Sequence, residues 1–214
     1  MVSMNTAAQS FFIWTSVLIT LVISCASLIA LWFGLIDASF LGYTDSGGMQ
    51  TGAAALIVSF PILLYVMRLV YIKELEAEKA FRPRQWVLYA VLFFSGFTLA
   101  YDVYTLLSSF LYGEELTAPF LMKVFLAGLL FSACFMFYRL ELKNYWSQHK
   151  KHLELVAMGS GLVVVFSVAL LFIVVGTPSY MRKMRSDQVL IQQLQTTQYQ
   201  IIDYFQRKGS LPKN

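Results

Sequence analysis

Charged residues are scarce in this chain of 214 residues: Asp, Glu, Lys and Arg together make up 13%, and only two histidines and two cysteines are present. About a quarter of the residues in an ordinary soluble domain are charged. Hydrophobic residues, by contrast, reach 58%. This composition excludes a disordered chain and argues against a soluble globular enzyme. It predicts an integral membrane protein. The net charge of +4 does not indicate nucleic-acid binding, because the basic residues lie at the ends of the apolar stretches and in the tail.

Five apolar stretches separate the charged clusters, and each is long enough to cross a membrane as a helix. We therefore predict an all-α integral membrane protein with a five-helix transmembrane domain over residues 1–178. Residues 179–214 are expected to form an extramembrane amphipathic helix and its tail. The predicted spans are 11–36, 52–72, 86–112, 117–138 and 155–176.

The amphipathic helix is indicated by apolar residues that recur on one helical face after Ser186, while glutamines cover the remaining surface. Gly209 and Pro212 are expected to end it in a plain turn. The apolar face comprises Leu190, Leu194, Thr197, Ile201 and Phe205.

The loops between the spans alternate in charge. The first loop, 37–50, and the third, 113–118, carry acidic but no basic residues, whereas the second, 72–85, and the fourth, 139–154, carry basic clusters. Because positive loops stay in the cytoplasm, we predict a cytoplasmic N-terminus and an outside C-terminal tail in a bacterial cytoplasmic membrane. Three basic residues within 182–185, directly after the last span, run against the placement of the tail.

Motifs for catalysis or metal binding are missing: there is no Walker loop, no GxGxxG and no CxxC. Cys25 and Cys134 lie inside apolar stretches, where thiols serve as small packing residues. His149 and His152 lie in the fourth loop with only Glu154 nearby, so we interpret them as solvated interfacial side chains. We therefore expect no enzyme activity, no metal and no cofactor.

Asp102 is the one charged residue expected deep inside a span, where a carboxylate costs about 2.5–3.5 kcal/mol on insertion scales. Arg68 and Lys123 lie near span ends and can extend to the membrane surface. Lys123 is a candidate partner for Asp102, although the helix rise leaves a vertical gap of roughly 10 Å to be bridged. Tyr101 and Tyr104 flank Asp102 and are candidate hydrogen-bond donors to it.

Hydroxyl side chains form polar stripes on the first and third predicted helices at steps of three and four residues. We expect the two stripes to face each other or a shared interior. They are interpreted either as a proton- or cation-responsive path or as interhelical hydrogen bonds, which contribute roughly 0.6 kcal/mol each. Gly128 with Ser132, or Gly159 with Ser160, is expected to permit close helix approach. One stripe is Ser95, Thr98, Asp102, Thr105 and Ser109, and the other is Ser16, Thr20, Ser24 and Ser27.

Several spaced pieces of the chain carry a family resemblance: 56–62, 101–111, 113–117, 120–124 and 137–142, with the tail from Gly176 to Pro212. The segment from Ala54 to Leu142 resembles the uncharacterised bacterial membrane family known as domain of unknown function 5671. The tail is similar to an extension that members of this family carry. The resemblance implies a membrane domain in which Asp102 and Lys123 are family features, and it implies no known activity. Before Phe120 the family tends to place an arginine, whereas this chain has Ala118 and Pro119.

Two hypotheses for function remain. The first is a non-enzymatic membrane module or accessory subunit that docks a protein partner, or a second copy, through the tail helix. The second is a small proton- or cation-coupled transporter or channel centred on Asp102. A water-filled cavity at Asp102 would favour transport, and a dry, hydrogen-bonded carboxylate would favour packing. A membrane enzyme is the weakest hypothesis, because the candidate acids and histidines lie at different depths.

Overall fold

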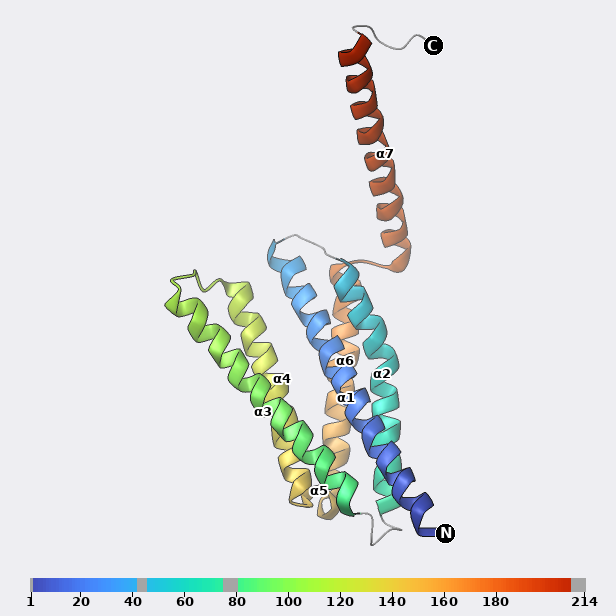
Figure 1. Ribbon diagram of the computed structural model, residues 1–214, viewed down its shortest axis with the longest axis vertical. Coiled ribbons are helices and arrows are strands. Elements are labelled where there is room, and N and C mark those ends of the chain that lie inside the picture. The colour runs from blue at the N-terminus through green and yellow to red at the C-terminus, as the bar shows by residue number, and fades with distance from the viewer. Residues whose placement is uncertain (1, 42–45, 75–80, 209–214) are drawn as a thin grey trace. The chain divides into compact units, whose positions relative to one another are not determined.

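Seven helices make up the regular structure of residues 2–41, 46–74 and 81–208, which a computed structural model describes (Figure 1). Six of them belong to one unit, residues 1–174, and the seventh belongs to a second unit, residues 175–214. The all-helical prediction is confirmed. The helices are α1 (Val2–Leu41), α2 (Ser46–Glu74), α3 (Phe81–Leu111), α4 (Ala118–Leu142), α5 (Tyr145–Gln148), α6 (Lys150–Val174) and α7 (Pro178–Lys208).

Five of these helices are long and apolar enough to cross a membrane, which agrees with the predicted number. Their ends differ from the predicted ends by up to five residues, some longer and some shorter, because the ends of helices are the least sharply defined part of a sequence pattern. The apolar segments are Phe11–Phe40, Gly48–Val70, Arg84–Leu111, Ala118–Leu142 and Lys150–Val174.

The turns follow the local sequence. Gly113 adopts a φ of 71° after α3, and Gly176 adopts a φ of 92° after α6; both are left-handed conformations that favour glycine. Pro119 lies in the first turn of α4, where its missing N–H costs no hydrogen bond. The fourth loop is more ordered than predicted, because Asn144, with a φ of 54°, leads into the short helix α5.

One predicted boundary is wrong. α1 continues through Asp37 to Leu41, so this acid lies on a helix and not in the first loop. α7 begins at Pro178, so the helix starts before the amphipathic pattern that follows Ser186 and includes the basic residues after the last span. The predicted closing turn at Gly209 and Pro212 lies outside the described residues.

α1 is the central helix of the first unit and packs against α2, α3, α4 and α6 (Figure 1). α1 and α2 form the most extensive helix pair, and α3 and α4 form the next. The α1–α2 pair is close because Gly52 has no side chain: a Cβ built there would lie 2.9 Å from the carbonyl oxygen of Ser27. Side-chain hydrogen bonds also join α1 to its neighbours, as from Trp32 Nε1 to Ser167 Oγ of α6 at 2.9 Å.

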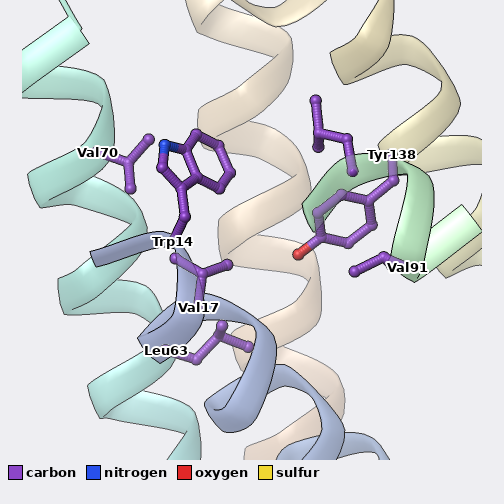
Figure 2. Close-up of a cluster of buried hydrophobic side chains, with 7 residues drawn as sticks. Trp14, Val17, Leu63, Val70, Val91 and Tyr138 are labelled. Atoms are coloured by element: carbon purple, nitrogen blue, oxygen red, sulfur yellow. The ribbon is translucent and has the colours of Figure 1, made fainter. Parts of the chain in front are cut away.

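A buried hydrophobic cluster lies where α1, α2, α3 and α4 meet (Figure 2). Trp14 of α1 and Tyr138 of α4 are its two aromatic members, and aliphatic side chains from α1, α2 and α3 complete it. This cluster sets the spacing of the two helix pairs. Its members are Trp14, Val17, Leu63, Val70, Leu88, Val91 and Tyr138.

Candidate functional site

Asp102 lies half-buried on α3, where its carboxylate approaches Gly128 of α4. A Cβ built on Gly128 would lie 3.1 Å from Asp102 Oδ2, so the space for the carboxylate exists because this residue is glycine. Within the described residues Asp102 makes no hydrogen bond or ion pair. The expected bonds from Tyr101 and Tyr104 are not formed: their side chains are 61% and 63% exposed, and their rings lie beside each other at 6.2 Å.

Lys123 pairs with Asp37, not with Asp102. Its Nζ atom lies 2.6 Å from Asp37 Oδ1 and also lies 5.6 Å from the centre of the Phe33 ring. The sequence placed Asp37 in a loop, and the longer α1 instead carries it to the beginning of α4. The ion pair therefore links α1 to α4 near the end of the bundle that holds the α3–α4 turn.

The polar stripe on α3 does not form a continuous path of hydrogen bonds. The hydroxyls of Ser95, Thr98 and Thr105 each donate to the carbonyl four residues earlier in the same helix, at 2.7, 2.8 and 2.8 Å. Ser95 is buried, whereas Thr98 and Thr105 are half-buried, as is Ser109 at the end of the stripe. These bonds satisfy each hydroxyl within α3 and leave Asp102 as the only ionisable member of the stripe.

The polar stripe on α1 was expected to face the stripe on α3 or a shared interior, and among the described residues the one side-chain bond that it makes to another helix goes to α2. Ser16 and Thr20 donate to carbonyls of their own helix at 2.8 and 2.7 Å. Ser24 donates to Ser59 Oγ of α2 at 2.9 Å in a buried site, and Ser27 packs its backbone against α2. Ser24 therefore serves the α1–α2 contact, as the interhelical interpretation expects for such a hydroxyl.

Cys25 and Cys134 come together across the α1–α4 contact. Their Sγ atoms are 3.8 Å apart, although the residues are separated by 109 positions in the sequence, and both thiols are free. The sequence interpretation treated them as unrelated packing residues. No local signal links them, because their meeting depends on the relative register of two distant helices.

A buried ion pair closes the opposite end of the α3–α4 pair. Arg84 Nη2 lies 2.7 Å from Glu141 Oε1, and the Glu141 side chain is 4% exposed. Arg84 Nη1 also donates to Asn144 Oδ1 at 3.0 Å. Arg84 and Asn144 border a small pocket together with Gln85, Leu88 and Leu142. The sequence assigned Arg84 only a topological role as a basic loop residue, because nothing local shows that α4 returns to it.

The two histidines stack on Tyr145 at the end of α4. The ring centres of Tyr145 and His149 are 4.3 Å apart, and Tyr145 Oη lies 3.1 Å from His152 Nδ1. Both imidazoles are exposed. Within the residues described by the structure, no group of three or more His, Cys, Asp and Glu side chains is arranged to hold a metal ion.

A known protein family covers most of this helix bundle. Residues 10–138, more than half of the chain, match the family described as domain of unknown function (DUF5671). The chain belongs to this family. The DUF5671 region includes Asp37, Asp102 and Lys123 and both cysteines, and it ends before Glu141, α6 and α7. No curated protein and no solved structure was found to match the chain.

Proposed function

We propose that this DUF5671 member is an integral membrane protein that crosses the membrane five times. The surface of the helix bundle supports this, because its outward side chains are large and apolar. Phe93 and Phe97 of α3 are 68% and 64% exposed, and Val165 of α6 is 70% exposed. Contiguous apolar surface of this kind is unfavourable in water and favourable against lipid tails. Resistance to extraction by an alkaline carbonate wash is expected, and release into the supernatant would contradict membrane insertion.

The distribution of charge supports an orientation with the N-terminus inside a bacterial cytoplasmic membrane. Basic residues gather where α3 begins and around α5, whereas Glu114 and Glu115 occupy the α3–α4 turn at the other end. The positive-inside rule then places the α3–α4 turn and the C-terminal tail outside. A periplasm-active reporter joined after Lys208 should be active, and a cytoplasm-active reporter at the same site should be inactive. The reverse result would move the tail inside.

The function that the structure supports best is docking of a helix from another protein onto α7. This helix exposes the predicted apolar face: Leu190, Leu194 and Phe205 are 57%, 62% and 50% exposed. Its other face is rich in glutamine, and residues 188–202 carry no charge. An interfacial membrane helix usually places lysine and arginine on its polar face, so this composition favours a protein helix over an anionic lipid surface. We infer a non-enzymatic membrane module or accessory subunit.

The docking proposal is tested by placing a photo-reactive residue on α7 of the full chain in native membranes. Attached at position 194, it should cross-link to a helix of another protein, and Leu194→Gln with Ile201→Gln should remove that partner from the complex isolated in mild detergent. Val189→Gln is the control, because it makes the same kind of change at an exposed position that lies about 120–140° around α7 from positions 194 and 201. A partner kept by the double variant would refute docking through this face. Cross-links only to a second copy of this chain would show that α7 mediates self-association and does not dock a different protein.

A second candidate function is proton- or cation-coupled transport centred on Asp102. The observation that favours it is a half-buried carboxylate in the middle of an apolar segment, beside Gly128 and without a hydrogen bond from any described residue. Ionisable groups at such depth usually serve transport or proton transfer. Flux of protons or sodium into proteoliposomes should stop in Asp102→Asn and persist in Glu115→Gln, which neutralises an exposed turn residue. Equal flux in both variants would remove this candidate.

A further inference from the structure

The two cysteines lie at a fixed register between α1 and α4. Cys25 and Asp37 are 12 residues apart on α1, and their partners Cys134 and Lys123 are 11 residues apart on α4. At 1.5 Å per residue, these intervals rise by about 18 Å and about 17 Å. The near-equal lengths show that α1 and α4 run side by side in opposite directions between the two contacts. The ion pair thus holds the thiols opposite each other from one end.

The contact between the thiols has little use as a hydrogen bond, because S–H is a weak donor and sulfur a weak acceptor. It also places two nucleophilic atoms where a covalent bond would join the two main helix pairs, α1–α2 and α3–α4. Their 3.8 Å separation must shorten to about 2.05 Å in a disulfide. Both residues are half-buried, so neither is sealed completely inside the bundle.

We propose that Cys25 and Cys134 form a modification site, at which an apolar hydroperoxide such as an oxidised lipid converts the two thiols into a disulfide between α1 and α4. One sulfur takes an oxygen from the hydroperoxide, whose O–O bond breaks to give an alcohol and a sulfenic acid. The second sulfur then attacks the first, forming the S–S bond, and the hydroxyl leaves as water with the second thiol's proton. Two thiols are oxidised and one hydroperoxide is reduced.

The disulfide fixes the position of the α3–α4 pair against α1. Only the choice of an apolar oxidant depends on the membrane insertion proposed above, and the site is independent of docking by α7. A chain that is released by carbonate and still forms the disulfide would refute insertion and leave the thiol pair intact. The two proposals therefore fail in different experiments.

The test uses the full chain in native membranes with a protease site inserted in the α3–α4 turn, residues 112–117. Cleavage there separates Cys25 from Cys134, so the two fragments stay together on a non-reducing gel only if the disulfide has formed. Cumene hydroperoxide should join the fragments, and dithiothreitol should separate them. Cys25→Ser and Cys134→Ser should each lower the joined fraction roughly tenfold or more, because the reaction depends on two thiols held in contact.

The matched control keeps the number of thiols and moves one of them. Cys25→Ala combined with Ala26→Cys turns the thiol about 100° around α1, to an exposed position, and should abolish the joined product. An apolar pyridyl disulfide, which joins neighbouring thiols by exchange, serves as a second reagent. Separate fragments after both reagents would refute the contact itself. Joining by the pyridyl reagent but not by the hydroperoxide would refute the oxidation site. Joining in the moved-thiol variant would also refute it.

Discussion

Gly52 of α2 offers a sharp test of the packing that places the site. A Cβ at this position would lie 2.9 Å from Ser27 O, 3.1 Å from Ala30 Cβ and 3.2 Å from Leu31 N. Two of these atoms belong to the backbone of α1 and cannot rotate away. Gly159 of α6 is the matched control, because a Cβ there would meet nothing within 4 Å.

The expected magnitude follows from these distances. Restoring an ordinary contact of about 3.5 Å would require α1 and α2 to separate by roughly 0.5 Å, which weakens every contact along the pair. Overpacking of this kind costs about 1–3 kcal/mol. Alanine also gains up to about 1 kcal/mol of helix propensity over glycine at either position. The propensity gain cancels when the variants are compared, so Gly52→Ala should be less stable than Gly159→Ala by about 1–3 kcal/mol.

The assay is the temperature at which half of the detergent-solubilised protein loses its monodisperse elution peak. For a chain of this size, the expected difference corresponds to a midpoint lower by roughly 2–12 °C in Gly52→Ala than in Gly159→Ala. The Gly159→Ala midpoint should equal or exceed that of the unaltered chain. Equal midpoints in the two variants would show that α1 and α2 are not in close backbone contact at Gly52.

The side-chain links give three further predictions, all measured by the same midpoint. Asp37→Asn or Lys123→Met should each lower the free energy of unfolding by about 1 kcal/mol, because both side chains keep roughly 30% exposure. The exchanged pair, Asp37→Lys with Lys123→Asp, should recover part of this stability, and no recovery would contradict the pairing. Arg84→Met should cost about 3–5 kcal/mol, because Glu141 is buried; combining it with Glu141→Gln should cost less than the two single losses together, and simple addition would count against the pair. Ser59→Ala should cost only roughly 0.6 kcal/mol, and a loss above 2 kcal/mol would show a larger role for this hydroxyl.

The helices could be predicted from the sequence because the length needed to cross a membrane is a local property. The turns at Gly113 and Pro119 were also local, since glycine and proline restrict the backbone wherever they occur. The end of α1 could not be predicted from local sequence. Asp37 looked like a loop residue because it follows an apolar run and is charged, and the compensating charge on Lys123 lies 86 residues away.

The candidate site shows the same division. The position of Asp102 within an apolar span was visible in the sequence, and so was the value of a glycine for close approach at position 128. What the sequence left open was the direction of each stripe, because helical spacing shows which residues share a face and not which neighbour that face meets. For that reason the stripe with Ser24 was expected to face the stripe on α3 or a shared interior, and the bond from Ser24 to α2 could not be predicted. The cysteine pair depends on the same missing information.

The central place of α1 has a consequence for how the bundle is made. α1 precedes every helix that packs against it, so the ribosome completes it before its partners. Its side chains carry a polar contact for three of the four helices that pack on it later: Ser24 for α2, Asp37 for α4 and Trp32 for α6. The order of synthesis is therefore also the order in which these contacts become available. Each new helix can pack on α1, which is already synthesised. A chain stopped after any later span therefore still contains α1, the helix on which the missing helices would have packed.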